Sequence, residues 1–585
     1  RNSARQTARG ETYMIDMPYE EVLGAVPFCL DKEAIDWVTN TMGRMSDDEK
    51  LEQLFCISVL DFTRENWRNT LSHLRPGALM YRPAPARSAV EYTNMAQRES
   101  EIPLLIAANL EKGGSGIAEE GTLYASPLEI AATGRVSNGK ILADICAQEA
   151  CELGCNWAFA PIVDIDNNFR NPITNTRTFG SDPNLVGLLG AEYIKTIQAY
   201  GIAASAKHFP GDGCDERDQH LVTTINDKSV EEWDRSYGQV YEKCIGSGVK
   251  TIMVGHIMQP AYERHFNPSI RDEDILPASL SRNLLQGLLR GRLGFNGLIC
   301  TDATTMVGFT VAMPRKRAVP YAIEAGNDMF LFTRNEAEDV KFMKQGYRDG
   351  ILSKRRLNEA VMRILGLKAS LGLHRGVREF SVQKAEHALL KSNNRTLARK
   401  CADEAITLVK EEPGVLPITP EKYPRILYYP LEAETAAFGY SVRGGACEQF
   451  RQALIARGFK VDIYQVDKAN MEGHISPTTE ILDNYDLCLY LANYSTKSNQ
   501  TTVRIEWMQP MGANCPVYIH EKPIVFISVE NPYHLIDVPR VKTYINAYCS
   551  TDAVLESLLD KLTGKDRFIG RNPVDPFCGK WDTRL

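Results

Sequence analysis

Short apolar runs alternate with amphipathic helical segments along the first 333 residues. Eight runs lie at 54–59, 77–82, 103–109, 156–164, 202–209, 251–257, 297–303 and 327–332, and helical patterns such as 138–154, 182–200, 229–248 and 282–293 separate most of them. The runs are continuously hydrophobic, which is typical of strands buried on both faces of a parallel sheet. The pattern predicts an α/β fold with a (β/α)8 TIM-type barrel, irregular because its first connections carry little helix.

A second α/β pattern follows the barrel pattern. After a basic helical stretch at 352–372, five apolar runs lie at 425–431, 460–466, 486–493, 523–529 and 542–548, with helical segments such as 446–457 and 551–562 between them. This order predicts an open, doubly wound sandwich. We therefore expect an N-terminal arm (1–30), a catalytic barrel (31–375), a linker (376–393) and a C-terminal α/β sandwich domain (394–585).

The bulk properties agree with two domains and exclude some classes of partner. A chain of 585 residues is longer than one hydrophobic core usually supports. Its net charge of −7 gives no electrostatic reason to expect nucleic acid or an anionic membrane as partner. No apolar run approaches the ~20 residues that span a bilayer. The polar first residues lack the apolar core of a secretory signal. The sequence does not indicate an oligomeric state.

The cysteines favour a reducing, cytoplasmic location. The fourteen cysteines form no CxxC pair and no zinc-type spacing with histidine, and several, such as Cys56 and Cys300, lie inside apolar runs. The second unit also lacks a GxGxxG motif after its first strand, so no dinucleotide site is indicated. We expect neither a metal nor a cofactor.

Polar residues gather where the predicted barrel strands end. The third strand ends in Asn109 within NLEKGG, the fifth in Lys207-His208, the sixth in His256 and the seventh in Asp302. In (β/α) barrels the carboxyl ends of the strands carry the reactive groups. The sequence therefore predicts an active site at this end of the barrel.

Two carboxylates in these segments allow more than one interpretation. Asp302 could be a helix N-cap, or a nucleophile or base at the barrel mouth. In Asp218-Gln-His220, residues two apart point the same way in an extended loop, so Asp218 could orient the imidazole for proton transfer. Alternatively this is a solvated loop, or a metal cluster with Asp212 and Asp215, although its spacing matches no calcium loop.

The basic residues also have structural alternatives. Lys207 could extend along the surface to solvent, His208 could satisfy a backbone carbonyl, and Arg177 could pair with Asp182. Such chemistry at several successive strand ends favours a functional interpretation.

Three motifs together resemble glycoside hydrolase family 3, in its β-N-acetylglucosaminidase branch. They are KHFPGDG with the following Asp-x-His, the NPITNTRTFGSDP segment, and GLICTDATTM. The resemblance covers nearly the whole chain, including NPYHLIDVP and INAYCSTDA in the second unit. It implies Asp302 as nucleophile, His220 supported by Asp218 as acid/base, and Arg177, Lys207 and His208 as sugar-binding residues. Asn109 and His256 complete the predicted substrate site.

Two positions depart from the family pattern. Many relatives have Asp-x-Glu-Gly-Gly where this chain has Asn109-Leu-Glu-Lys-Gly-Gly, so the hydrogen-bonding group at Asn109 lacks charge. Many have PGHG where this chain has PGDG, which replaces an imidazole by Asp212.

The resemblance implies a retaining exo-β-N-acetylglucosaminidase that works by double displacement on a β-linked GlcNAc-containing saccharide. A neutral histidine base would repel an anionic acceptor less than a carboxylate, so phosphorolysis at the same site is an alternative. An exo-β-glucosidase or xylosidase is another. A sugar-binding protein without catalysis is disfavoured because Asp302, His220 and Asp218 are all present.

Overall fold

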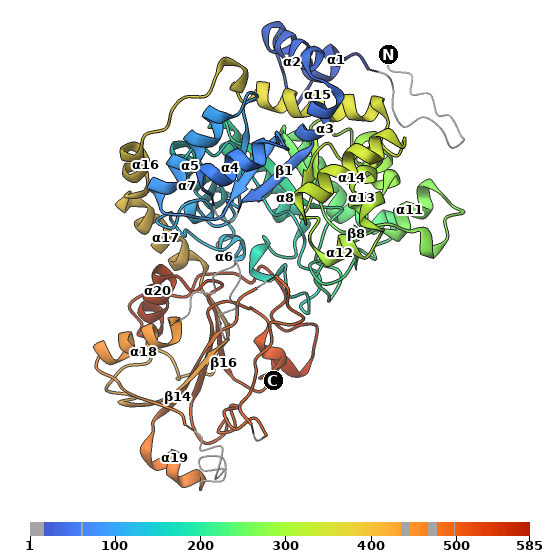
Figure 1. Ribbon diagram of the computed structural model, residues 1–585. Helices are drawn as coiled ribbons and strands as arrows, with labels where there is room; N and C mark the ends of the chain where they lie inside the picture. The colour runs from blue at the N-terminus through green and yellow to red at the C-terminus, as the bar shows by residue number, and fades with distance from the viewer. Residues whose placement is uncertain (1–16, 60–61, 434–444, 466–476, 497, 510) are drawn as a thin grey trace, which may run out of the picture.

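A computed structural model describes residues 17–59, 62–433, 445–465, 477–496, 498–509 and 511–585 of the chain. Residues 1–16 of the predicted arm and residue 466 of a predicted strand lie outside the described residues. The described part divides into a barrel, drawn at the top of Figure 1, and a second sheet beneath it.

The barrel contains all eight strands that the hydrophobic runs predict. They are β1 (Phe55–Val59), β2 (Ala78–Tyr81), β3 (Leu105–Ala108), β4 (Trp157–Ala158), β5 (Ala203–Phe209), β7 (Thr251–Val254), β9 (Leu298–Thr301) and β10 (Phe330–Leu331). Neighbouring strands pair in parallel in the order β10-β1-β2-β3-β4-β5-β7-β9. A single parallel bridge between Cys300 and Met329 joins the two ends of the sheet. The barrel is therefore nearly closed, and its carboxyl ends share one face.

Helices surround the barrel. They are α3 (Asp47–Gln53), α4 (Arg64–Leu71), α5 (Ala86–Glu99), α6 (Pro127–Ala132), α7 (Val136–Glu152), α8 (Pro183–Ala199), α9 (Val230–Trp233), α10 (Gln239–Gly246), α11 (Pro260–Phe266), α12 (Val307–Thr310), α13 (Arg315–Ala325), α14 (Glu336–Arg348) and α15 (Lys354–Ser370). Two further helices, α1 (Tyr19–Gly24) and α2 (Lys32–Arg44), lie beside α15 (Figure 1).

Local sequence signals explain where several helices begin. Ser46 and Glu49 form a capping box at α3, in which the Glu49 carboxylate accepts the Ser46 backbone N–H at 2.7 Å. The segment predicted as one helix at 229–248 instead passes through a π-helical turn at Asp234–Gly238 between α9 and α10. Asn283–Arg292 is also π-helical. Both segments bury apolar residues, such as Tyr237 and Leu288, so hydrophobic spacing alone does not distinguish them from α-helix.

The second domain is a doubly wound sheet, as the sequence predicts. Its strands are β11 (Thr407–Lys410), β12 (Arg425–Glu432), β13 (Lys460–Ile463), β14 (Leu487–Asn493), β15 (Ile524–Ser528) and β16 (Thr543–Asn546), with helices α18 (Ala446–Ala456), α19 (Thr478–Asn484) and α20 (Asp552–Leu562). The order is β11-β16-β15-β14-β12-β13. Among the described strands of this sheet, only the edge strand β11, which the hydrophobic pattern missed, pairs antiparallel.

A ladder of aromatic rings crosses one face of this sheet. Stacked ring centroids lie 4.7 Å apart for Tyr464 and Tyr429, 4.0 Å for Tyr429 and Tyr490, 5.6 Å for Tyr490 and Phe526, and 5.5 Å for Phe526 and Tyr544. The rings belong to the buried core on that face. Aromatic stacking across adjacent strands stabilises the sheet beyond simple burial.

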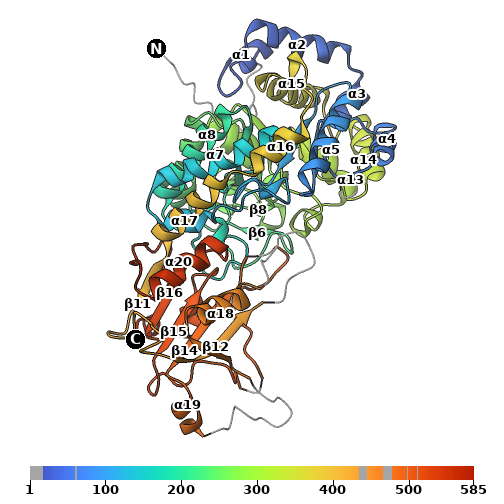
Figure 2. The same cartoon turned by 90° about the vertical axis from the view of Figure 1, so that its left-hand side faces the viewer.

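The two domains meet at the carboxyl face of the barrel. Figure 2 shows α16 (Val382–Leu389) and α17 (Ser392–Ala405) descending from the barrel side to the second sheet. Helix α17 contacts α7 and α6 on the barrel and α20 on the second domain. Helix α16 lies within the segment expected to be a linker.

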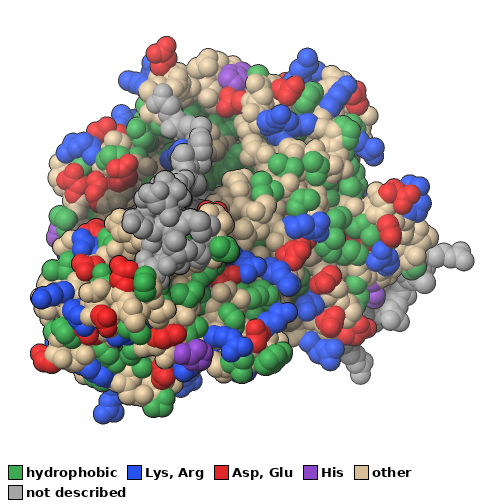
Figure 3. All heavy atoms as spheres, turned by 90° about the horizontal axis from the view of Figure 1, so that it is seen from below, with side chains coloured by type: hydrophobic (Ala, Val, Ile, Leu, Met, Phe, Trp, Pro, Cys, Tyr) green, Lys and Arg blue, Asp and Glu red, His purple; other side chains and the backbone are tan. Residues whose placement is uncertain are grey.

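In the lower face seen in Figure 3, acidic and basic side chains are intermixed. None of the described helices has the length and apolar content needed to cross a bilayer.

Candidate active site

Asp302 lies directly after β9, at the barrel face that meets the second domain. Its backbone N–H donates to Val254 O at 2.8 Å, and its carboxylate accepts the Ala303 N–H at 2.7 Å. The next helix, α12, has Met306 as its N-cap. The interpretation of Asp302 as a helix cap is therefore wrong. Its side chain keeps 15% exposure, which leaves the carboxylate accessible to a ligand.

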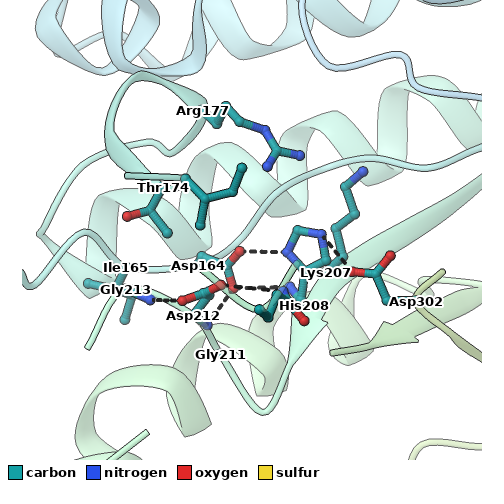
Figure 4. Close-up of polar contacts among 12 residues, drawn as sticks. Asp164, Ile165, Thr174, Arg177, Lys207, His208, Gly211, Asp212, Gly213 and Asp302 are labelled. Carbon is teal, nitrogen blue, oxygen red and sulfur yellow. Dashed lines mark hydrogen bonds and ion pairs between the residues drawn. The ribbon is translucent and has the colours of Figure 1, made fainter. Parts of the chain in front are cut away.

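Three imidazoles act electrostatically on this carboxylate. Burial alone raises the pKa of Asp302, but His208, His256 and His220 together lower it below the usual aspartate value. His208 Nε2 lies 3.7 Å from Asp302 Oδ2 (Figure 4). Asp302 is thus ionised at neutral pH, as a carboxylate nucleophile must be.

Asp164 orients His208 from the other side. Its Oδ2 lies 2.8 Å from His208 Nδ1, and its Oδ1 accepts the backbone N–H of His208 at 3.0 Å. Oδ1 also accepts the Asp212 N–H at 2.8 Å. The His208 ring is therefore held between two carboxylates, with its position set by Asp164 (Figure 4). The sequence shows Asp164 at a strand end but assigns it no partner.

Glu111 organises the cationic side of the site. Its carboxylate accepts from Arg177 Nε at 3.2 Å and Nη2 at 3.0 Å, and from Lys207 Nζ at 2.9 Å. Burial raises the pKa of Glu111, but the two cations outweigh it and hold the pKa well below its usual range. Asp182, the alternative partner for Arg177, instead caps α8 by accepting the Asn184 N–H. The sequence assigns Glu111 no role, because its partners lie 66 and 96 residues further along the chain.

Asp218 and His220 form the predicted dyad. His220 Nδ1 lies 2.7 Å from Asp218 Oδ1, which also accepts the His220 backbone N–H at 2.9 Å. The second oxygen, Oδ2, accepts the Asn499 N–H at 2.8 Å from the C-terminal domain. Burial opposes ionisation of Asp218, but these contacts lower its pKa overall. Among the described residues no group of His, Cys, Asp or Glu is arranged to hold a metal ion, which contradicts the metal-cluster interpretation.

The loop that carries the dyad is anchored to α12. The Val307 N–H donates to His220 O at 3.1 Å and the Gly308 N–H donates to Gln219 O at 3.1 Å. Thr223 Oγ1 donates to Gly308 O at 2.7 Å. Since α12 follows Asp302 in the chain, the dyad and Asp302 are tied to one short segment.

His256 and Asp212 lie beneath the site. Burial lowers the pKa of His256 to about 4, so its ring is neutral at neutral pH. Nε2 donates to Ala303 O at 2.9 Å and Nδ1 accepts from Ser279 Oγ at 2.8 Å. Full burial fits a supporting role behind Asp302 better than the direct sugar contact that the sequence suggests. Burial and the neighbouring Asp164 raise the pKa of Asp212, so it adds little negative charge.

Asn109 directly follows β3 and is partly buried. Figure 4 shows Arg177, Lys207 and Asp302 converging on the space beside His208. The structure thus brings an ionised carboxylate, an Asp-His pair and two cationic side chains to the carboxyl face of one barrel.

This combination defines a barrel enzyme that cleaves glycosidic bonds, since such enzymes pair a carboxylate with a proton donor at the barrel mouth. The model of the glycosyl hydrolase family 3 N terminal domain matches residues 46–367. The chain is 53% identical, over 96% of its length and all of the relative, to a beta-N-acetylglucosaminidase/beta-glucosidase from Cellulomonas fimi. The chain belongs to glycosyl hydrolase family 3, as its motifs imply.

Solved structures resemble the chain over both domains. A beta-glucoside phosphorylase, BglX, superimposes with a TM-score of 0.90 at 43% identity, covering 97% of this chain and all of that one. A family 3 beta-N-acetylglucosaminidase from Paenibacillus sp. str. FPU-7 has a TM-score of 0.75 at 24% identity, covering 91% of this chain and 99% of that one. The second likeness supports the two-domain fold.

Proposed function

We propose that the protein is a retaining exo-β-glycosidase that removes a terminal β-linked N-acetylglucosamine or glucose residue. The observation that carries this proposal is the electrostatic cluster of Asp302 with His220, whose ring is held by Asp218. These groups supply a nucleophile and a proton donor at one barrel mouth. The relative from Cellulomonas fimi, whose name joins both specificities, supports the choice of the two sugars.

In the first step Asp302 attacks the anomeric carbon and the bond to the leaving oxygen breaks. The protonated His220 donates its Nε2 proton to that oxygen, because Nδ1 already faces Asp218. A covalent glycosyl-enzyme and a free alcohol result. In the second step the neutral His220 takes a proton from water, the oxygen bonds to the anomeric carbon, and the Asp302 carboxylate leaves. Two inversions retain the anomeric configuration.

The cationic side of the site holds the sugar. Arg177 and Lys207 donate to sugar hydroxyls while Glu111 fixes both side chains in place. His208 orients a hydroxyl near the nucleophile, and Asn109 supplies an uncharged donor and acceptor. These contacts contribute orientation rather than bond chemistry.

Phosphate is the second candidate acceptor. The solved structure with a TM-score of 0.90 carries the name of a phosphorylase. After the first step His220 is neutral, so an incoming phosphate meets less repulsion than it would from a carboxylate base. Phosphate oxygen would then displace Asp302 and give a sugar 1-phosphate of retained configuration.

One experiment separates these outcomes. Nitrophenyl β-N-acetylglucosaminide and β-glucoside are each turned over with and without inorganic phosphate, and the products are identified by NMR. Free sugar at an unchanged rate supports hydrolysis. A phosphate-dependent rate with sugar 1-phosphate supports phosphorolysis. No turnover of either glycoside under both conditions would refute the proposed glycosidase.

The cytoplasmic location stays a prediction. In the structure all fourteen cysteines are free thiols.

A further inference from the structure

Gln219 lies between the two residues of the dyad and is 2% exposed. Its Oε1 accepts the His256 backbone N–H at 2.8 Å, and its Nε2 donates to Asp212 Oδ2 at 3.3 Å. His256 follows β7 and Asp212 follows β5. One side chain therefore joins the dyad loop to the ends of two barrel strands.

These contacts belong to a chain of hydrogen bonds beneath the site. Asp164 accepts the Asp212 N–H and positions His208, Asp212 accepts from Gln219, and Gln219 accepts from His256. His256 in turn donates to the carbonyl of Ala303, the residue after Asp302. The chain thus connects the supports of His208, of the dyad and of Asp302.

The space around Gln219 allows little rearrangement. A Cβ placed on Gly308 would approach Gln219 O to 2.6 Å and His256 Cβ to 3.0 Å. A Cβ placed on Gly255 would approach Gln219 Oε1 to 3.1 Å. Contacts this close need a residue without a side chain, so the dyad loop packs tightly on α12 and the end of β7.

We propose that Gln219 is a positioning residue that sets the location of the His220 imidazole relative to Asp302. The reason is geometric. Asp218 and His220 flank Gln219 and contact each other at 2.7 Å, while the Gln219 amide bonds to residues that follow two barrel strands. Asp212, which stands where many family members have histidine, supplies the acceptor for the Gln219 amide. A shift of about 1 Å in a catalytic group costs on the order of 10²-fold in rate.

The test compares Gln219→Ala and Gln219→Glu with a matched control, Gln198→Ala. Gln198 bridges the opposite ends of the same strands: its Oε1 accepts from Lys250 N at 2.9 Å and from Ala204 N at 3.3 Å, and its Nε2 donates to Gly248 O at 2.8 Å. The control therefore loses a comparable bridging glutamine far from the dyad. Gln219→Glu keeps the acceptor for His256 but places a carboxylate against Asp212.

The kinetic arm, which rests on the proposed function, uses aryl glycosides whose leaving groups range from dinitrophenol to phenol. Proton donation matters most for poor leaving groups. Gln219→Ala should lower kcat/KM about 10²-fold for the phenyl glycoside but only a few-fold for the dinitrophenyl glycoside. Gln219→Glu should fall between it and the wild type. Gln198→Ala should lower both rates equally. Equal losses across the series in Gln219→Ala would overturn the positioning role.

The second arm needs no activity. Hydrogen exchange of peptides covering 214–224 should quicken in both Gln219 variants and stay unchanged in Gln198→Ala. Unchanged exchange in Gln219→Ala would also overturn the inference. A wild-type protein that releases no phenol from any glycoside would refute the proposed function instead, and the exchange comparison would still decide the role of Gln219.

Discussion

Tyr533 of the second domain donates its hydroxyl hydrogen to Asp166 of the barrel, with 2.6 Å between the Tyr533 hydroxyl oxygen and Oδ2. The other carboxylate oxygen accepts from Thr174 Oγ1 at 2.6 Å. Thr174 and Asn175 precede Arg177, and Asn175 Nδ2 donates to Asn531 Oδ1 at 3.0 Å across the same boundary. The second domain therefore supports the loop that carries Arg177, and Asn499 supports the dyad.

Removal of the Tyr533 hydroxyl should loosen this boundary. In Tyr533→Phe the buried Asp166 Oδ2 loses its donor, which costs about 1–3 kcal/mol of unfolding free energy. Differential scanning calorimetry should show a lower Tm. Tyr321→Phe, a change on the outer helix α13, is the control and should leave Tm within experimental error. An unchanged Tm in Tyr533→Phe would mean that the contact contributes nothing to docking.

The raised pKa of Asp166 predicts that the stability of the protein depends on pH. Burial raises the pKa of Asp166 to about 6, above the ordinary value of 3.8. The folded protein then binds this proton more tightly than the unfolded chain. This contribution is complete below pH 3.8 and is lost as pH rises through about 6, up to about 3 kcal/mol. The unfolding free energy of the wild type, minus that of Asp166→Asn, should therefore fall as the pH rises from 3.8 to about 6. A difference that does not change with pH would refute the raised pKa of Asp166.

Asp302→Asn should remove the nucleophile without unfolding the protein. Glycoside turnover should fall by at least about 10³-fold, because the amide cannot form the covalent intermediate. Circular dichroism should stay unchanged. The control Asp31→Asn lies at the N-cap of α2, where asparagine also caps well, and should keep full activity. Substantial turnover by Asp302→Asn would place the nucleophile elsewhere.

His220→Ala should depend on the leaving group. With phenyl glycosides the rate should drop about 10²–10⁴-fold, whereas dinitrophenyl glycosides need little proton donation and should retain the first step. The steady-state rate measures complete turnover of each substrate, and the initial burst of dinitrophenolate measures the first step with the dinitrophenyl glycoside. His73, an exposed partner of Glu336, provides the control His73→Ala, which should match the wild type. If the first step with dinitrophenyl glycosides slowed as much as turnover of phenyl glycosides does, His220 would not be the acid.

Glu111→Gln should be strongly destabilising. Lys207 is 3% exposed and Arg177 is 8% exposed, so the substitution leaves two buried cations without their shared anion. Such losses cost about 3–5 kcal/mol. In contrast, Glu99→Gln removes the partner of Arg64 and Arg68, which are well exposed, and should cost less than about 1 kcal/mol. Urea unfolding measures both losses of unfolding free energy. Similar losses in the two variants would show that Glu111 does not stabilise the buried pair Arg177 and Lys207.

The sequence predicts most of the fold because hydrophobic runs mark every barrel strand. It misses β11, whose edge position needs no continuous apolar run, since three of its four residues are only partly buried. The π-helical turns also escape it. Their apolar spacing resembles that of an α-helix over short stretches.

The candidate site is predicted in its chemistry but not in its connections. The strand-end rule and the motifs identify Asp302, Lys207 and the Asp218–His220 pair, because these residue types stand out locally. Glu111 and Gln219 act through partners far away in the chain, so no local pattern indicates them. The anchor at Asn499 comes from another domain, which spacing cannot foresee.

The aromatic ladder in the second sheet adds an optical signal to that of the tryptophans. Of its six tryptophans, the three fully buried ones, Trp67, Trp157 and Trp233, all lie in the barrel. The stacked tyrosines Tyr429, Tyr490 and Tyr544 lie in the second domain. Tryptophan fluorescence is thus weighted toward the barrel, whereas near-ultraviolet dichroism of tyrosine combines the stacked rings of the sheet with buried barrel tyrosines such as Tyr193, Tyr237 and Tyr241. A single unlabelled melt followed by both probes would reveal whether the domains unfold together or in sequence.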